Sequence, residues 1–240
     1  MDHVKAFNIK FNGLTKEYIL SLLNQKDFKL IIPTNAELTI LANENERFME
    51  ILNKNTITID GHIPYWLIKL KYKNINIEKL SGSDLIYDLC EEANKKGFKV
   101  FLLGGLESSN VKSQERLRSL FSELIIDGYS PPYYPYPFPE DLNKIIIDKI
   151  SKFSPDILFV AFGAPKQEFW VDDNKELLEK IGVRITIGLG GAFEMVAGVE
   201  KRAPKWIQKM GLEGPWRIYQ NPKRFERFLR LYRFFKYIFD

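Results

Sequence analysis

Short, uninterrupted apolar runs recur along the chain and alternate with longer stretches of helical periodicity. The runs are continuous and end in glycine or a small polar residue, which is typical of strands buried on both faces of a sheet. We predict six strands, at 28–32, 56–59, 99–103, 123–126, 156–162 and 184–187. Helical patterns lie between them at 36–52, 84–96, 109–121, 139–153 and 166–181. This alternation predicts an α/β fold with a mostly parallel sheet and right-handed crossovers.

Polar residues and glycines cluster where the predicted strands end. In chain order they are Thr34 and Asn35, Asp60 and Gly61, Gly104 and Gly105, Asp127 to Tyr129, Gly163 and Gln167, and Gly188, Gly190 and Gly191. Loops are rich in such residues in any protein. In open parallel sheets, however, ligands bind beyond the carboxyl ends of the strands. We therefore expect one pocket shared by all six strand ends.

Basic residues gather at the C-terminal end of the chain, although the formal net charge is only +4. At the spacing of an α-helix, one side of the segment from 222 onward is apolar: Phe225, Phe228, Leu229, Leu231, Tyr232, Phe235 and Phe239. The other side is basic: Arg227, Arg230, Arg233 and Lys236. Such a helix suits the surface of an anionic membrane, and packing on its own domain is the alternative. Arg224 falls in the apolar sector, which favours an anionic partner inside the protein.

Length and composition limit the domain organisation, the partners and the compartment. The 240 residues fit one α/β domain with a small appendage, and we place the division between 1–203 and 204–240. A net charge of +4 is too small to indicate a nucleic acid partner. The single cysteine, Cys90, is expected to be a buried core thiol in a reducing cytoplasm. We find no signal peptide and no apolar run of about 18 residues, and the oligomeric state, a homo-oligomer included, stays open.

Asp60 is the main candidate for chemistry, because it is a lone carboxylate at a strand end. It could be a general base, a metal ligand or a turn former, since Asp-Gly is a common turn dipeptide. The Asp-x-Asp pattern of metal-dependent sugar transferases is absent from the chain, and Asp172 and Asp173 are helix neighbours that do not face each other. We therefore expect neither a metal nor another cofactor. His62 lies near Asp60, but a hydrolase is disfavoured because a Gly-x-Ser-x-Gly elbow is lacking.

Glycines and one glutamine are candidates for contact with phosphate and sugar. Gly190 and Gly191 belong to Gly-Leu-Gly-Gly-Ala-Phe, which departs from the dinucleotide spacing Gly-x-Gly-x-x-Gly at its last position. The string can still open a helix whose free N–H groups hold a diphosphate. Gly104 begins a weaker copy of this device, and close packing is the alternative role for each. Gln167 stands near a predicted helix start, where its amide can donate to and accept from a sugar hydroxyl.

Several short strings together resemble the WecG/TagA/CpsF family of glycosyltransferases. They are Pro33-Thr34-Asn35-Ala36-Glu37, Asp60-Gly61 with Pro64, Ser81-Gly82-Ser83-Asp84-Leu85, Gly163-Ala164-Pro165-Lys166-Gln167-Glu168, Gly190-Gly191-Ala192-Phe193, Arg202-Ala203-Pro204, Gly211-Leu212-Glu213, Trp216-Arg217, and Asn221-Pro222-Lys223-Arg224 with Arg227. They run in consistent order from about residue 7 to 233, which is nearly the whole chain. Similarity of that extent is not credible as chance.

The resemblance implies a Rossmann-like sheet and an inverting glycosyltransferase that needs no metal. Members of the family move N-acetylmannosamine, its uronic acid or another hexose from a UDP-sugar. Their acceptor is typically N-acetylglucosaminyl-diphospho-undecaprenol, in the synthesis of teichoic acid, enterobacterial common antigen or capsule. The implied partners are thus a UDP-sugar, a polyprenyl-diphosphate-linked acceptor and an anionic membrane surface. The implied location is cytoplasmic, peripheral on the inner face of the cell membrane.

The resemblance also implies roles for individual residues. Asp60 would be the general base, and Thr34, Asn35 and Gln167 would line the sugar site. The appendage would bring arginines to the diphosphate: Arg217, Arg224 and Arg227. The other residues counted as substrate-binding are Lys79, Gly104, Tyr129, Gly190, Gly191 and Glu194.

The chain departs from the family pattern at three places. Lys79 stands where the family usually has arginine, and lysine is a point charge rather than a planar fork. Glu194 stands where aspartate usually follows Gly-Gly-Ala-Phe, so its carboxylate has a different reach toward the nucleotide. Gly214 and Pro215 replace the usual aromatic residue after Leu-Glu, at the turn into the appendage.

Two other classes of protein fit parts of this pattern. One is a nucleotide-binding module without chemistry, whose output would not change in an Asp60→Asn variant. The other is an NAD-dependent oxidoreductase, which the glycine spacing disfavours. A nicotinamide-binding titration would detect it.

Overall fold

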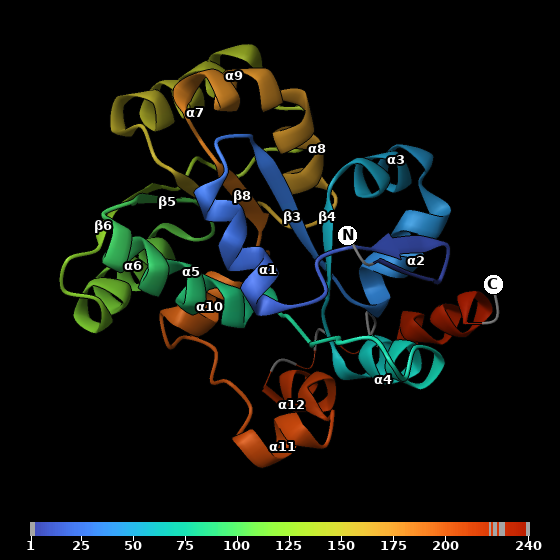
Figure 1. The fold of residues 1–240 in the computed structure, drawn as a ribbon. Helices are drawn as coiled ribbons and strands as arrows, with labels where there is room; N and C mark the ends of the chain where they lie inside the picture. Colours follow the sequence, from blue (N-terminus) through green and yellow to red (C-terminus); the bar gives the residue numbers. More distant parts are fainter. Residues whose placement is uncertain (1–2, 221, 223–224, 226–228, 239–240) are drawn as a thin grey trace.

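The computed structural model describes residues 3–220, 222, 225 and 229–238, without the side chains of residues 205, 209 and 217. A six-stranded sheet lies between two layers of helices (Figure 1). Its strands are β3 (Lys29–Thr34), β4 (Thr56–Ile59), β5 (Lys99–Gly104), β6 (Ile125–Tyr129), β7 (Ile157–Ala161) and β8 (Ile185–Gly188). They are ordered β4-β3-β8-β7-β5-β6, and every neighbouring pair is parallel. The predicted α/β fold with a parallel sheet and helices on both faces is confirmed.

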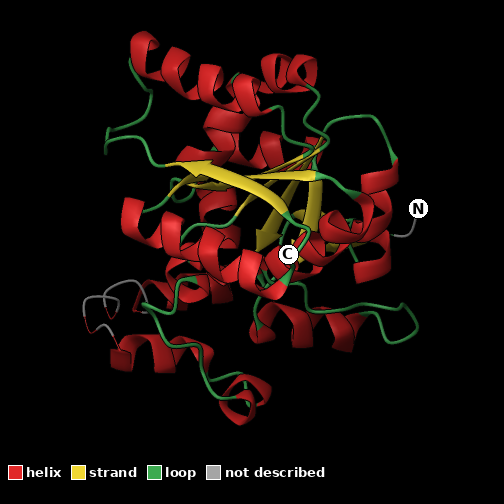
Figure 2. Cartoon of the chain, turned by 90° about the vertical axis from the view of Figure 1, so that its left-hand side faces the viewer, coloured by secondary structure: helices red, strands yellow, loops and turns green. Residues whose placement is uncertain are grey.

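Alternate strand residues supply two separate apolar cores. In β3, Leu30 and Ile32 belong to one core and Ile31 belongs to the other. The first core is covered by α2 (Ala36–Glu44), α3 (Glu46–Lys54), α7 (Glu140–Phe153), α8 (Lys166–Asp173) and α9 (Lys175–Ile181). The second is covered by α1 (Lys16–Ser21), α5 (Gly82–Lys96), α6 (Glu107–Leu120) and α10 (Ala192–Val196). Figure 2 shows the sheet between these layers.

The first part of the chain forms a small unit that the apolar pattern does not predict. Strands β1 (Val4–Ala6) and β2 (Ile9–Phe11) pair as an antiparallel hairpin, ahead of α1 and a short 3-10 turn, η1 (Leu22–Asn24). Phe7 and Asn8 form the two-residue turn with positive φ at both positions, as tight hairpins require. Strands of three residues are too short for their periodicity to be recognised.

Two long helices of the prediction are each divided by an asparagine. Asn45 separates α2 from α3, and its side chain accepts a hydrogen bond from the Phe48 N–H to start the second helix. Asn174 separates α8 from α9. A further helix, α4 (His62–Lys71), was not predicted. Pro64 lies in its first turn, where a missing N–H leaves no hydrogen bond unmade.

The C-terminal part contains α11 (Lys205–Lys209), α12 (Glu213–Gln220) and the 3-10 helix η3 (Arg230–Tyr237). A 3-10 helix has three residues per turn, so residues three apart lie on one face. Phe234 and Tyr237 are buried, and the Phe234 ring lies 4.9 Å from that of Phe7. Tyr232 and Phe235 form a second, exposed face. A helical C-terminal region is thus confirmed, but over Arg230–Tyr237 it winds as a 3-10 helix rather than the expected α-helix, and the single apolar side is wrong.

One residue of the predicted basic side also has an ion-pair partner in the structure. Arg233 forms an ion pair with Glu44, which ties η3 to α2. The division at 203 and 204 stays a prediction. Among the helices in the described part of the chain, none combines the length and apolarity that a bilayer crossing requires.

Candidate active site

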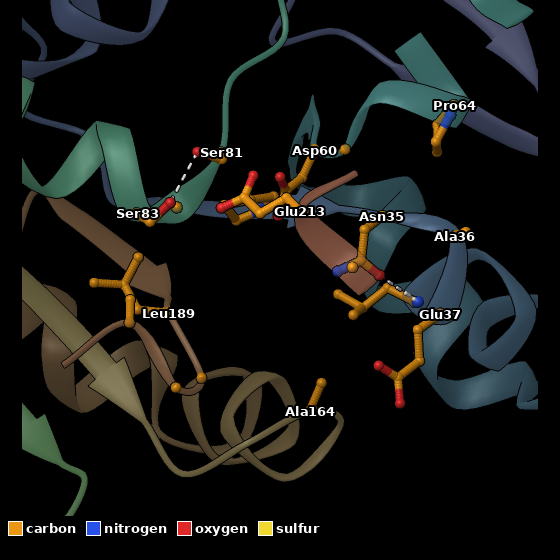
Figure 3. Close-up of a pocket in the computed structure, with 18 of the residues that line it drawn as sticks. Asn35, Ala36, Glu37, Asp60, Pro64, Ser81, Ser83, Ala164, Leu189 and Glu213 are labelled. Atoms are coloured by element: carbon orange, nitrogen blue, oxygen red, sulfur yellow. Dashed lines mark hydrogen bonds between the residues drawn. The ribbon is translucent and has the colours of Figure 1, made fainter. Parts of the chain in front are cut away.

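A cavity of about 460 Å³ opens at the carboxyl ends of four strands: β3, β4, β7 and β8 (Figure 3). Gly211, Glu213 and Ile218 close it from the C-terminal part, together with Leu231 of η3. Among the described residues, those after β5 and β6 do not line it. One pocket over all six strand ends is therefore a wrong expectation for β5 and β6. The carboxyl edge, by contrast, is where sheets of this kind bind ligands.

The first turns of four helices face this cavity. Ala36 begins α2, His62 begins α4, Gly82 begins α5 and Gln167 lies in the first turn of α8, and all four line it. Helix starts present unpaired N–H groups and the positive end of the helix dipole. The cavity is therefore suited to an anionic ligand such as a phosphate group.

Asp60 stands at the end of β4, where its own N–H donates to the Thr34 carbonyl 3.0 Å away. Its side chain lines the cavity beside Asn35 and Glu213 (Figure 3). Burial raises the pKa of Asp60 to about 6, and the nearby charge of Lys79 opposes this rise. At neutral pH the group is therefore an ionised carboxylate with raised basicity, which is what a general base requires.

Glu213 is a pocket residue that the sequence pattern did not single out for a role. It begins α12 and brings its carboxylate to the cavity, which Glu37 also lines, and its charge contributes to the raised pKa of Asp60. Its position follows from the turn at Gly211, whose φ is +74°. A β-carbon there would lie 2.7 Å from the Trp66 ring, so only glycine allows this approach.

A cluster of charges lies beside the cavity at the start of α5. Asp84 forms ion pairs with Arg202 and, at 4.0 Å, with Lys79. Ser81 donates to the same carboxylate over 2.6 Å. These hydrogen bonds and cations hold the pKa of Asp84 below its usual range despite its burial. Lys79 thus faces two carboxylates, Asp84 and Asp60, and lies beside the cavity without lining it.

Gln167 joins the two loops that border the cavity. Its side-chain oxygen accepts from the N–H groups of Gly163 and Gly190, each at 3.1 Å. Its side-chain nitrogen donates to Glu168 over 2.8 Å. Gly188 makes room for this pair, since a β-carbon there would lie 2.5 Å from the Gln167 nitrogen. Gln167 therefore braces the site as well as lining it.

Glu168 is fully buried behind this amide, and burial raises its pKa to about 7. Its second carboxylate oxygen has no hydrogen-bond partner among the described residues. The carboxyl group fixes the orientation of the Gln167 amide, because only the nitrogen can donate to it.

The remaining predicted residues divide by their position. Asn35, Gly190 and Gly191 line the cavity with Asp60 and Gln167. The others that are described do not line it: Thr34, Lys79, Gly104, Tyr129 and Glu194. Arg224 and Arg227 fall outside the described residues, as does the side chain of Arg217, whose backbone is in α12. The roles assigned to all of these residues stay predictions.

Two of the residues outside the cavity have structural partners that explain their position. Thr34 is fully buried, and its hydroxyl donates to the Ile32 carbonyl over 3.1 Å. The Gly104 carbonyl accepts from the Asn110 and Ser130 side chains. Helix α6, which follows Gly104, does not line the cavity.

The chemistry that the site allows is proton abstraction next to a bound anion. Within the part of the chain that the structure describes, no three His, Cys, Asp or Glu side chains gather as metal ligands would. The raised basicity of Asp60 suits proton abstraction, and the helix starts suit the binding of a phosphate group. Asn35 contributes less than its side chain could, because its oxygen accepts from the Leu38 N–H as the cap of α2.

Comparison with known proteins agrees with this arrangement. The family model described as "Glycosyl transferase WecG/TagA/CpsF family" matches residues 4–240. A protein of Bacillus spizizenii named N-acetylglucosaminyldiphosphoundecaprenol N-acetyl-beta-D-mannosaminyltransferase is 31% identical over 210 residues, covering 87% of this chain and 78% of its own. A Bacillus subtilis protein of the same name is 28% identical over 218 residues, covering 91% and 80%. This chain therefore belongs to the WecG/TagA/CpsF family of glycosyltransferases.

Proposed function

We propose that this glycosyltransferase moves N-acetylmannosamine, or a related hexose, from a UDP-sugar to a polyprenyl-diphosphate-linked N-acetylglucosamine. The observation that carries the proposal is one cavity in which a carboxylate of raised basicity meets four helix starts. The acceptor and the sugar are those in the names of the two Bacillus relatives. Teichoic acid or surface polysaccharide synthesis is the corresponding setting.

The proposed reaction is a single displacement with inversion at the anomeric carbon. Asp60 takes the proton from the acceptor hydroxyl while its oxygen forms the new glycosidic bond. The bond from the anomeric carbon to the diphosphate breaks, and UDP leaves with the bonding electrons. The starts of α2 and α5 stabilise the charge that develops on the diphosphate, in place of a metal ion. Arg217, Arg224 and Arg227 remain the proposed source of further positive charge.

We place the protein at the inner face of the cell membrane, where a polyprenyl-linked acceptor is embedded. The exposed face of η3 supports this placement, since Tyr232 is 73% and Phe235 is 64% exposed. Arg230 and Lys236 are exposed on an adjacent face of the same helix. Aromatic residues next to basic ones are typical of segments that lie on anionic membranes.

A panel of UDP-sugars tests the proposed reaction. We expect transfer of N-acetylmannosamine to a short-lipid N-acetylglucosaminyl diphosphate, detected by mass spectrometry of the product. Turnover should persist within about twofold in excess chelator, because helix starts take the role that a metal would have. Loss of activity in chelator with rescue by magnesium or manganese would contradict metal independence. Absence of product with every UDP-sugar would contradict the donor class.

The pH profile tests the part of Asp60. We expect kcat/KM to fall below about pH 6, because only the ionised carboxylate accepts a proton. Glu213→Gln removes a negative neighbour, so the acidic limb should move to lower pH. Lys79→Met removes a positive neighbour, so the limb should move to higher pH. If the fall of kcat/KM at low pH occurs at the wild-type pH in both variants, a group other than Asp60 controls it.

A further inference from the structure

We propose that helix α4 and the turn at Gly211 form a membrane-contacting surface around the mouth of the cavity, facing an anionic bilayer. We call this the α4 surface and define it by Ile63, Trp66, Leu70, Met210 and Leu212. The inference rests on the proposed membrane-linked acceptor. It adds a contact element that lies apart from η3 in the sequence.

The α4 surface is apolar and exposed. Ile63, Trp66 and Leu70 are spaced three and four residues apart on α4, so they lie on one side of that helix. They are 48%, 48% and 68% exposed. Large apolar side chains that gather in this way on a surface mark a contact with a partner or a membrane.

The turn at Gly211 extends this stripe. The Gly211 backbone packs directly on the Trp66 ring, which leaves no space for a β-carbon between them. The flanking side chains Met210 and Leu212 are 56% and 42% exposed. In Figure 1, α4, α11 and α12 accordingly lie together at the lower end of the molecule, far from α7 and α9.

The charges of the two segments favour an anionic partner. Residues 61–77 contain no aspartate or glutamate but three lysines, at 69, 71 and 73. Residues 201–212 also lack acidic residues and contain three lysines, besides Arg202, which is paired with Asp84. Basic residues around an apolar stripe match an anionic lipid surface, where lysine stems lie along the apolar region and the charges reach the headgroups. A symmetric contact with a second copy would instead bring lysines against lysines.

The cavity and the α4 surface are continuous. Ile63 and Gly211 line the cavity, and Ile63 is also the first residue of the exposed stripe. A bilayer seated on this surface would therefore lie at the opening of the site. A lipid-linked acceptor could then reach Asp60 with its sugar while its chain stayed in the membrane.

Vesicle flotation of the full chain tests the α4 surface. The variant combines Leu70→Ser, Lys71→Gln and Lys73→Gln, three exposed residues of which none lines the cavity. We expect its partitioning to phosphatidylglycerol-containing vesicles to fall about 100-fold. Each lysine should contribute a factor of about five and the leucine the remaining factor of about four. The matched control combines Ile145→Ser, Lys144→Gln and Lys149→Gln on α7, and it should float like wild type.

Each outcome separates this inference from the proposed function. Flotation needs no substrate, and transfer to a soluble acceptor analogue should stay within about twofold of wild type in both variants. If the α4 variant floats as well as wild type, the inference is overturned. It is also overturned if the variant only dissociates an oligomer, since the surface then binds a second copy. Should the triple variant not fold, Lys71→Gln with Lys73→Gln, expected to weaken flotation about 25-fold, decides the question.

Discussion

Asp60→Asn is expected to lower turnover by about 10² or more while the protein stays folded. Loss of a general base typically costs a factor of this size. Asp60 is the carboxylate whose pKa is raised into the range where a base is both ionised and effective at neutral pH. The measurement is single-turnover transfer at saturating donor. Near wild-type turnover in the folded variant would contradict the assignment of Asp60 as the base.

Glu213→Gln is the matched control, because it removes a cavity-lining carboxylate close enough to influence Asp60 with the same change of atoms. We expect it to retain most of its turnover at neutral pH. The acidic limb of its pH profile should move to lower pH, because the charge of Glu213 helps to raise the pKa of Asp60. A fall as large as that of Asp60→Asn would show that Glu213 is the base instead.

Asp60→Asn should also make the fold more stable at neutral pH. The pKa of Asp60 is about 6 in the folded protein and about 4 in an unfolded chain. Between these values the unfolded state releases its proton first, so stability falls as the pH rises from about 4 to 6. Above that range the cost is complete, at about 1–2 kcal/mol for a site open to solvent. Asp60→Asn should therefore raise the unfolding midpoint at pH 7 and leave it unchanged at pH 4.

The sheet could be predicted from the sequence because its strands are buried on both faces. A continuous apolar run as short as 157–161 is too short for a typical helix, so a strand is the natural interpretation. Glycine or polar residues mark the ends of such runs. The hairpin at Val4–Phe11 could not be predicted, since each strand has only three residues. The breaks at Asn45 and Asn174 were also missed, because apolar periodicity continues across each cap.

The site was predictable at the strand ends and less so elsewhere. Asp60 and Asn35 could be placed at the cavity because they directly follow buried strands, and Gln167 because it lies in the first turn of the helix after β7. Glu213 was not given a role, because it reaches the cavity only through the tight packing of Gly211 on Trp66. Strand order decides the remainder: β5 and β6 stand at the far edge of the sheet, so Gly104 and Tyr129 end away from the cavity.

The C-terminal segment shows how helix type changes the meaning of a pattern. At about 100° per residue, Leu231 shares a side with Tyr232 and Phe235. At three residues per turn, Leu231 joins Phe234 and Tyr237 on the face that packs against the core. Only tertiary packing decides between an α-helix and a 3-10 helix here. The sequence pattern therefore predicted a broader exposed apolar face than the structure has.

Gln167→Ala is expected to impair folding stability and turnover together. The change leaves the N–H groups of Gly163 and Gly190 without their acceptor. Each unpaired group costs about 1–3 kcal/mol where it is shielded from water, so we expect a loss of about 2–4 kcal/mol. Turnover should fall by about 10²-fold, because the two loops that border the cavity lose their common anchor and small misplacements are costly in catalysis. Thermal unfolding and transfer kinetics measure the two effects.

Gln114→Ala is the control for burial of a glutamine. Gln114 is 8% exposed in α6 and donates to Asn110 over 2.8 Å, and it does not line the cavity. It should lose stability without a matching loss of turnover. If Gln167 acted only by contact with the sugar, its alanine variant would raise KM and leave the unfolding midpoint where it was. A combined loss is expected, because the oxygen of this amide holds both loops while its nitrogen has a second hydrogen to offer a sugar hydroxyl.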